Sequence, residues 1–215
     1  ISIFGYFADL ADQRRVHPGP DMVTALTQVG VDGSKLTDDE VVLNCDGLMN
    51  GGLETTPHAM SGALLAFAEN PGQWRRLKRD RELCDDAVEE ILRWVSPPTH
   101  TMRTAVTDTT LGDARILAGD RVVVWFPSCN RDESVFPEAD RFQIDRKPNQ
   151  HSAFGGGPHY CVGAMLARLE VRCLLGVMLR RIADIGLAGE IVRMPSNFLH
   201  GLRKLEVSLT PEPSG

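Results

Sequence analysis

The sequence predicts a mainly α-helical protein with small β-sheets, built as a single domain over residues 1–215. Apolar residues recur at helical spacing over several long stretches, of which the longest runs from about residue 38 to residue 69. Shorter stretches that alternate apolar and polar residues, as strands do, lie mainly beyond residue 98. The chain is 42% apolar and 24% charged, which is typical of a globular domain with an ordinary core.

The composition argues against several classes of protein. The net charge of −6 is opposite in sign to that expected of a general nucleic-acid binder. No apolar run approaches the roughly 20 residues that span a bilayer, and no signal peptide opens the chain, so we expect no membrane insertion. The five cysteines are scattered without a CxxC pair, which indicates a reducing compartment and argues against a disulfide scaffold or a zinc cluster.

The first 36 residues predict two short helices. Apolar residues at helical spacing predict the first helix over residues 3–15, and the run His17-Pro18-Gly19-Pro20 ends it. Asp21 is a suitable N-cap for a second helix that continues to about Leu26 and ends before the Gly30–Gly33 turn.

The long helix predicted over residues 38–69 contains an unusual centre. It begins with a capping box, because Thr37 is followed three residues later by Glu40. In its middle, the run Gly51-Gly52-Leu53-Glu54-Thr55-Thr56-Pro57 combines poor helix formers, which together cost several kcal/mol by propensity. Taken alone, this run predicts a kink at Pro57; a functional use of these residues is the other interpretation.

Two more helices follow. Pro71 suits the first position of a helix that places Trp74 and Leu77 inward and four basic side chains outward, either as a solvated face or as a docking surface for an acidic partner. The next helix covers Leu83–Val95 and contains Glu90 and Arg93 at the spacing of an i,i+3 ion pair. Pro97 and Pro98 end it.

The predicted strands occupy three stretches. Residues 99–105 alternate as a strand does. Residues 111–126 predict a hairpin in which Ile116 and Leu117 face Val122–Trp125 across a turn at Gly119-Asp120. Residues 192–210 predict a second strand pair with a turn at Gly201.

The stretch from Phe154 to Cys161 reads Phe-Gly-Gly-Gly-Pro-His-Tyr-Cys and is the most specific pattern in the chain. Three glycines and Pro158 exclude a helix or a central strand and predict a tight, rigid loop. An amphipathic helix is expected directly after it, so Cys161 lies where a helix N-terminus favours a negatively charged thiolate. Its apolar residues are Val162, Met165, Leu166 and Leu169. Cys161 and His159 alone do not make a tetrahedral metal site.

This pattern resembles the haem-binding loop of the cytochromes P450. The resemblance is to bacterial-type members and extends nearly end to end, but it matches only the C-terminal part of the family's chain, so we expect a fragment with a partial P450 fold. It implies that Cys161 is the axial thiolate of haem b. It also implies that the cofactor contacts His159, Arg103 and three further residues. These are Phe154, Gly155 and Gly52.

The same resemblance implies roles for the remaining motifs. Glu54 and Thr55 would pass protons to the oxygen-binding face, and Glu90 with Arg93 would hold the segment that supports the haem without taking part in the chemistry. Substrate would contact a mixed set of side chains on three segments. These are Met49, Thr99, His100, Asn197 and Phe198.

We therefore expect a cytoplasmic, monomeric monooxygenase that hydroxylates or epoxidises a small, biosynthetic molecule with electrons from a separate ferredoxin or flavodoxin-type donor. One alternative is a peroxide-driven or isomerising haem-thiolate enzyme; the Glu54–Thr55 pair argues against it, because such a path has less need of a proton relay. Another is a binding module without haem, against which the retained Cys161, Phe154 and His159 argue.

Overall fold

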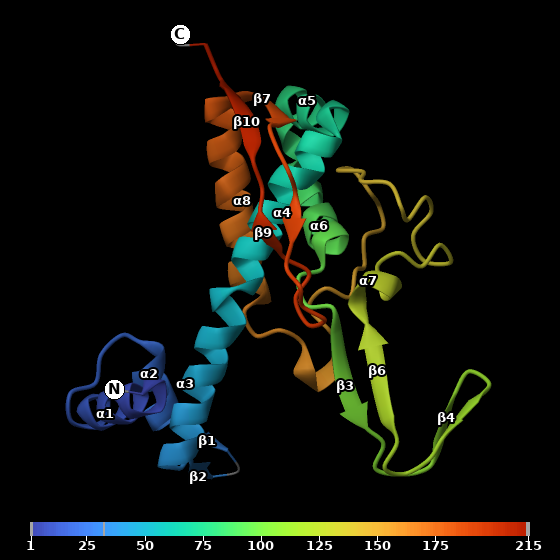
Figure 1. The fold of residues 1–215 in the computed structure, drawn as a ribbon. Helices are drawn as coiled ribbons and strands as arrows, with labels where there is room; N and C mark the ends of the chain where they lie inside the picture. The colour runs from blue at the N-terminus through green and yellow to red at the C-terminus, as the bar shows by residue number, and fades with distance from the viewer. Residues whose placement is uncertain (1, 32, 214–215) are drawn as a thin grey trace. The chain divides into compact units, whose positions relative to one another are not determined.

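The computed structural model describes residues 2–31 and 33–213. The chain divides into two compact units, one up to Glu54 and one from Thr55 onward, where the sequence had predicted a single domain. Helices dominate both units, and the strands form small two-stranded sheets (Figure 1). Within the described residues, no helix is both long and apolar enough to cross a bilayer.

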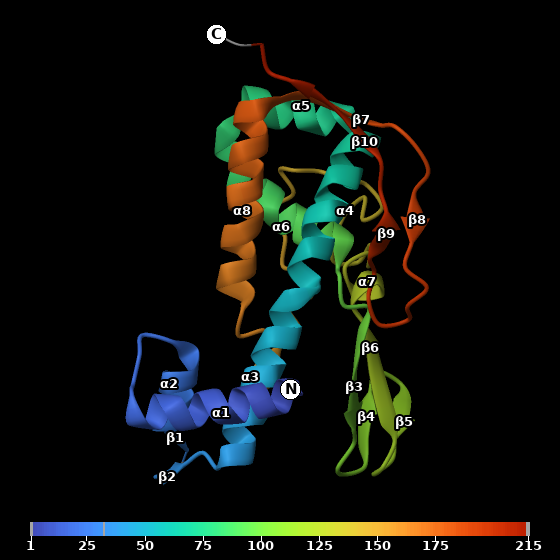
Figure 2. The same ribbon diagram turned by 60° about the vertical axis from the view of Figure 1, so that its left-hand side comes forward.

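The smaller unit packs two helices against a third. Helices α1 (Ile3–Val16) and α2 (Met22–Gln28) contact α3 (Asp38–Leu53) (Figure 2). In the connection from α2 to α3, strands β1 (Gly30–Val31) and β2 (Ser34–Lys35) pair with each other. The predicted caps are present: Asp21 accepts the amide of Thr24, and Thr37 forms the capping box with Glu40. The buried core of this unit consists of Ala11, Val23, Val41 and Cys45.

The long helix predicted over residues 38–69 is two helices in the structure. Helix α3 ends at Leu53, α4 (Thr55–Glu69) begins two residues later, and Glu54 between them is not helical. The break falls inside the run of poor helix formers and three residues before Pro57, where the sequence had placed a kink. The cost of keeping this run helical accounts for the interruption.

Four helices form the centre of the larger unit. Helix α4 contacts α5 (Pro71–Arg79), α6 (Cys84–Val95) and α8 (Ala164–Arg181), and a short 3₁₀ turn, η1 (Arg81–Leu83), leads into α6 (Figures 1 and 2). Trp74 is fully buried and its indole Nε1 donates to the carbonyl of Ala183 at 3.1 Å. Edge-to-face contacts join the Phe67 ring to the rings of Trp74 and Phe142.

Four strand pairs complete the larger unit. They are β3 (His100–Thr104) with β6 (Arg121–Trp125), β4 (Thr109–Leu111) with β5 (Ala114–Ile116), β7 (Ile182–Leu187) with β10 (Val207–Pro211), and β8 (Val192–Arg193) with β9 (Leu202–Lys204). Two short turns, α7 (Phe126–Cys129) and η2 (Gly157–His159), lie in the connections.

The prediction that residues 111–126 form one hairpin is wrong, because the two strands in this stretch do not pair with each other. Strand β6 pairs with β3, with Met102 opposite Val123, while β5 turns back onto β4 around Gly112. Backbone hydrogen bonds join Ala105 to both Gly119 and Asp120, so the predicted turn continues the β3–β6 ladder. The cross-strand partner of β6 is therefore the earlier strand.

The helix predicted after Cys161 is present as α8, but the apolar face that the sequence indicates is exposed instead of buried. Its core-facing residues are Val171, Leu175, Met178 and Leu179. Near its start, an apolar strip lies exposed and consists of Val162, Met165, Leu166 and Leu169. The prediction of a helix was therefore correct, and the prediction of its buried face was wrong.

Candidate functional site

The loop from Phe154 to Cys161 closes on itself. The amide of Cys161 donates to the carbonyl of Phe154 at 2.9 Å, and the amide of Gly155 donates to the carbonyl of Ser152 at 2.9 Å. Gly155 and Gly157 have φ angles of +70° and +62°, which side chains with a Cβ rarely adopt. The glycines are therefore needed for the shape that presents Cys161.

Cys161 is exposed and precedes the helix that follows it. Helix α8 begins at Ala164, two residues later than the start at Val162 that the sequence predicts, and the amide of Ala164 donates to the carbonyl of Cys161 at 3.2 Å. The thiol thus lies at the end of the loop and before the first turn of α8. It is held there by main-chain hydrogen bonds on both sides.

A clamp of side chains fixes this loop to α6 and α8. The guanidinium of Arg168 lies 4.6 Å from the centre of the Phe154 ring and donates to both carboxylate oxygens of Glu89, at 2.7 and 2.9 Å. It also donates to the hydroxyl of Tyr160 at 3.2 Å. His151 Nε2 lies 3.2 Å from Glu89 Oε2. No local pattern in the sequence points to Glu89 and Arg168, because the two residues are 79 positions apart.

The Glu89 clamp makes stability depend on pH. Burial opposes ionisation of Glu89, but hydrogen bonds from His151 and Arg168 outweigh it and lower the pKa of Glu89 from 4.5 to about 2. A carboxyl whose pKa is lower in the folded state stabilises the fold above its unfolded pKa. That stabilisation is lost as the pH falls from about 4.5 toward 2.

We therefore expect Glu89→Gln to lower the free energy of unfolding near neutral pH by on the order of 2 kcal/mol. The difference from wild type should shrink as the pH falls below about 4.5, where Glu89 is protonated in the unfolded chain. Urea unfolding of both proteins between about pH 6 and pH 3 measures this. A difference that stays constant over this range would contradict the assignment.

Glu90 and Arg93 form the buried ion pair that their spacing predicts. Both side chains are fully buried, and Arg93 donates to the two Glu90 oxygens at 2.8 Å each. Glu90 also accepts hydrogen bonds from the Arg146 side chain, the main-chain N–H of Gln143 and the Asn149 side chain. The pair is therefore the centre of a network that orders the irregular segment 130–149.

A chain of hydrogen bonds runs from this pair to the loop that carries Cys161. Arg93 donates to the carbonyl of Asn130 at 2.6 Å, and the Asn130 side chain accepts the amide of Ser152 at 2.7 Å. The carbonyl of Ser152 in turn accepts the amide of Gly155. The geometry thus links Glu90 and Arg93 mechanically to the position of Cys161.

The structure brings together four of the five predicted substrate-contacting residues. The amide of Thr99 donates to the carbonyl of Phe198 at 2.9 Å, and the Thr99 hydroxyl donates to the carbonyl of Asn197. The rings of His100 and Phe198 lie 5.9 Å apart, edge to face. The fifth residue, Met49, belongs to the smaller unit.

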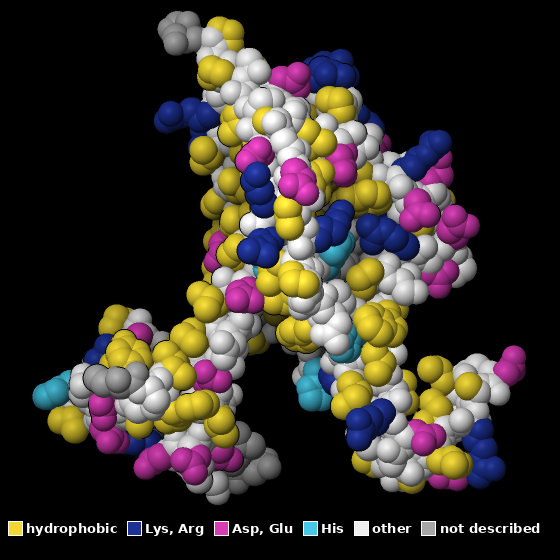
Figure 3. Space-filling view, viewed as in Figure 1, with side chains coloured by type: hydrophobic (Ala, Val, Ile, Leu, Met, Phe, Trp, Pro, Cys, Tyr) yellow, Lys and Arg dark blue, Asp and Glu magenta, His cyan; other side chains and the backbone are white. Residues whose placement is uncertain are grey.

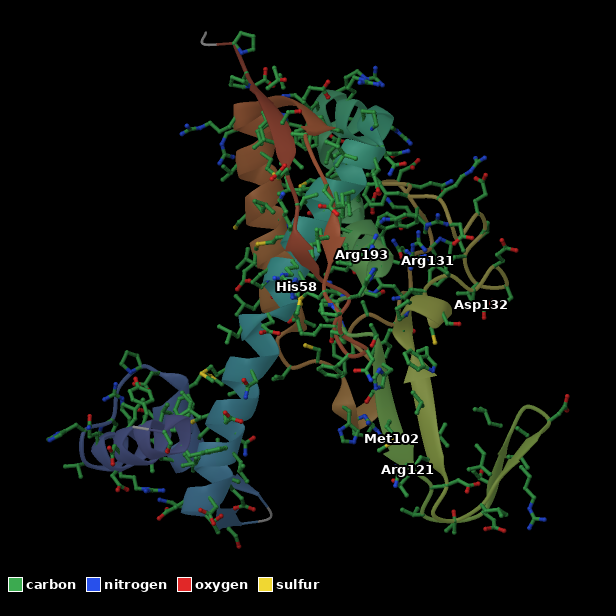
Figure 4. All side chains as sticks on the ribbon, viewed as in Figure 1. His58, Met102, Arg121, Arg131, Asp132 and Arg193 are labelled. Carbon is green, nitrogen blue, oxygen red and sulfur yellow. The ribbon has the colours of Figure 1, made fainter. Side chains whose placement is uncertain are left out.

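The remaining predicted site residues are spread over both units. Arg103 is exposed on β3, directly after Met102, which Figure 4 labels, and donates to the Thr101 hydroxyl and the Met102 carbonyl. His159 is exposed in η2. Gly52 and Glu54 are exposed at the end of the smaller unit, and Thr55 is the first residue of α4.

The basic face predicted on α5 is only partly available. Arg76 forms a two-pronged ion pair with Asp145, and Lys78 pairs with Glu212 and donates to the carbonyl of Ile182. Arg75 and Arg79 are exposed. The structure therefore corrects the prediction of four outward basic residues, since two of them are tied to neighbouring segments.

Comparisons with known proteins agree on one family. The family model described as Cytochrome P450 matches residues 11–183. Cytochrome P450 NovI of Streptomyces niveus is 42% identical over 205 residues, which cover 95% of this chain and 50% of that protein. Linalool 8-monooxygenase of Pseudomonas putida is 38% identical over 208 residues, covering 97% of this chain and 51% of that protein.

Solved structures give the same result for the fold. The crystal structure of CYP109E1 from Bacillus megaterium in complex with testosterone superposes with a TM-score of 0.89 at 36% identity, over 95% of this chain and 57% of that one. This agreement confirms the predicted fold class. The chain spans about half the length of the curated relatives that it matches.

Proposed function

Since the chain belongs to the cytochrome P450 family, we propose that Cys161 binds the iron of a haem and that the whole protein is a monooxygenase. The observation that carries this proposal is the presentation of Cys161. Its thiol is exposed at the end of a closed loop that the Glu89–Arg168 clamp and the Glu90–Arg93 network both support. A thiolate in this position would be suited to hold the iron of a haem.

The residues around Cys161 fit a haem. The glycines of the loop put bare backbone beside the thiol, which lets a flat macrocycle approach closely. Phe154 supplies an aromatic face, and Arg103 and His159 are exposed groups suited to the two propionates. Among residues 2–31 and 33–213, no three or more His, Cys, Asp or Glu side chains form a group that could hold a metal ion.

The bound haem would supply the activation of dioxygen, which side chains alone cannot perform. Cys161 would hold the iron through its thiolate, which is an electron-rich ligand. The protein must also deliver protons and exclude bulk water from the reacting face. Glu54 and Thr55 are suited to proton delivery, because a carboxylate and a hydroxyl are consecutive in the sequence where the helix is interrupted.

We place the substrate near Thr99, His100, Asn197 and Phe198. These residues come from the start of β3 and from the loop before β9, and they combine ring surfaces with a hydroxyl and main-chain polar groups. Such a mixed surface suits a small organic molecule with few polar groups. A relative named for linalool and a structure in complex with testosterone support this class. Electrons would come from a separate ferredoxin or flavodoxin-type protein.

Labelled dioxygen tests this function. The whole protein, supplied with a ferredoxin or flavodoxin and its reductase, is incubated with a panel of terpenes and steroids under ¹⁸O₂. One labelled oxygen atom per product molecule is the expected result, and it should disappear in Cys161→Ala. Product that carries oxygen from water, or labelled product that persists in Cys161→Ala, would exclude the proposed activity.

A further inference from the structure

The larger unit contains a small basic cavity of about 100 Å³ that the proposed reaction does not use. Its lining includes His58 from α4, Arg131 from the loop after α7, Arg193 from β8 and His200 from the turn before β9. Figure 4 shows His58, Arg131 and Arg193 in the same part of this unit. Neither Arg103 nor His159, which we assign to the haem, is part of the lining.

Close backbone approaches shape the walls of this cavity. A Cβ atom on Gly201 would lie 2.5 Å from the His58 ring, so the ring packs directly on the main chain there. A Cβ atom on Gly62 would lie 2.6 Å from the Val95 methyl groups, so α4 and the end of α6 touch through this glycine. Both contacts hold the lining elements at fixed separations.

Hydrogen bonds orient the polar side chains of the cavity. His200 Nδ1 lies 2.8 Å from the carbonyl of Val95, so this nitrogen carries the proton and donates it. Nε2 then accepts, and Arg193 Nη1 lies 2.9 Å from it. Burial lowers the pKa of His200, the Val95 hydrogen bond raises it, and nearby Arg193 and Arg131 lower it again. A neutral His200 therefore holds the guanidinium of Arg193 in place.

The charge of the cavity is unbalanced. Arg131 stacks on Trp94 at 4.7 Å, and among the described residues its carboxylate partner is Asp140, which is 3.7 Å away and has an 83% exposed side chain. Within residues 2–31 and 33–213, no carboxylate lies within ion-pair distance of Arg193. The single acidic residue of the lining is Glu69, which is exposed. Figure 3 shows Lys and Arg side chains gathered around histidine atoms on this face.

We propose that this cavity binds a small oxyanion or a carboxylate group between Arg131 and Arg193. Guanidinium groups donate paired hydrogen bonds in a geometry that matches both phosphate and carboxylate oxygens. An anion here would compensate two arginines that lack a close carboxylate partner, and His58 offers a further nitrogen to it. The volume limits the bound part to a single phosphate or carboxylate group with a few waters.

Titration with inorganic phosphate and with acetate tests the proposal and separates the two ligand classes. The ring resonances of His58 and His200 are followed by NMR in the whole protein, with ionic strength held constant by sodium chloride. We expect saturable shifts of both rings with at least one of the two anions. Shifts with both indicate a general oxyanion site, and shifts with acetate alone indicate a carboxylate site.

Two variants make the test specific. Arg193→Gln should weaken the binding at least about tenfold, and Arg131→Gln should weaken it in the same direction. Arg203→Gln is the matched control, because Arg203 is exposed on β9 of the same strand pair and is not part of the lining. The absence of saturable shifts, or equal weakening by Arg193→Gln and Arg203→Gln, would overturn the proposal.

Discussion

Replacing Glu90 by Gln is expected to lower the free energy of unfolding by about 3–5 kcal/mol. The substitution keeps the size of the side chain but removes the charge that compensates two buried arginines, Arg93 and Arg146. The exposed fraction of Glu90 and Arg93 is 0%, so water cannot take over the lost interactions. The loss should also loosen the hydrogen-bonded path through Asn130 to the Cys161 loop.

The chain contains a matched control for this experiment. Glu138 and Arg141 form an ion pair with the same i,i+3 spacing, but their side chains are 53% and 71% exposed. Glu138→Gln should therefore change the free energy of unfolding by less than about 1 kcal/mol. Urea unfolding of the two variants and of wild type gives the comparison. Similar small losses in both variants would show that the buried pair does not organise the fold.

Replacing Thr55 by Ala is expected to lower product formation by about 10²–10⁴-fold while leaving the haem spectrum unchanged. This expectation depends on the proposed function. Without the hydroxyl, the protein would deliver protons less efficiently, and more of the dioxygen consumed would be reduced only to hydrogen peroxide, which takes up two electrons and two protons. The quantities to measure are product and peroxide formed per dioxygen consumed.

Two further variants isolate the hydroxyl of Thr55. Thr55→Ser keeps a hydroxyl and should recover most of the product yield. Thr56→Val removes the neighbouring hydroxyl, which is buried at 7% exposure, and should leave the ratio of product to peroxide unchanged. Full product yield from Thr55→Ala would remove Thr55 from the proton path.

Local signals predicted much of this structure. The Thr37–Glu40 capping box, the Asp21 cap and Pro71 at the start of α5 all act on neighbouring backbone groups, and each marks a helix start in the structure. The Glu90–Arg93 pair was equally visible, because its partners lie one turn apart on the same helix. The loop shape followed from glycines that adopt positive φ angles.

Long-range partners were not predictable in this way. The alternation in β6 was clear, but nothing local showed that it pairs with β3 instead of the strand before it. Glu89 resembles an ordinary surface residue until Arg168 is placed beside it. The apolar strip of α8 shows the same limit, since periodicity defines a face but does not say what covers it.

The carbon monoxide difference spectrum of the reduced whole protein tests the central assignment, that Cys161 is a haem ligand. We expect a strongly red-shifted Soret band that is lost in Cys161→Ala. Cys173→Ala is the matched control, because Cys173 is also an exposed cysteine, and it should keep the band. A band typical of histidine-ligated haem in wild type, or a red-shifted band that survives in Cys161→Ala, would contradict the assignment.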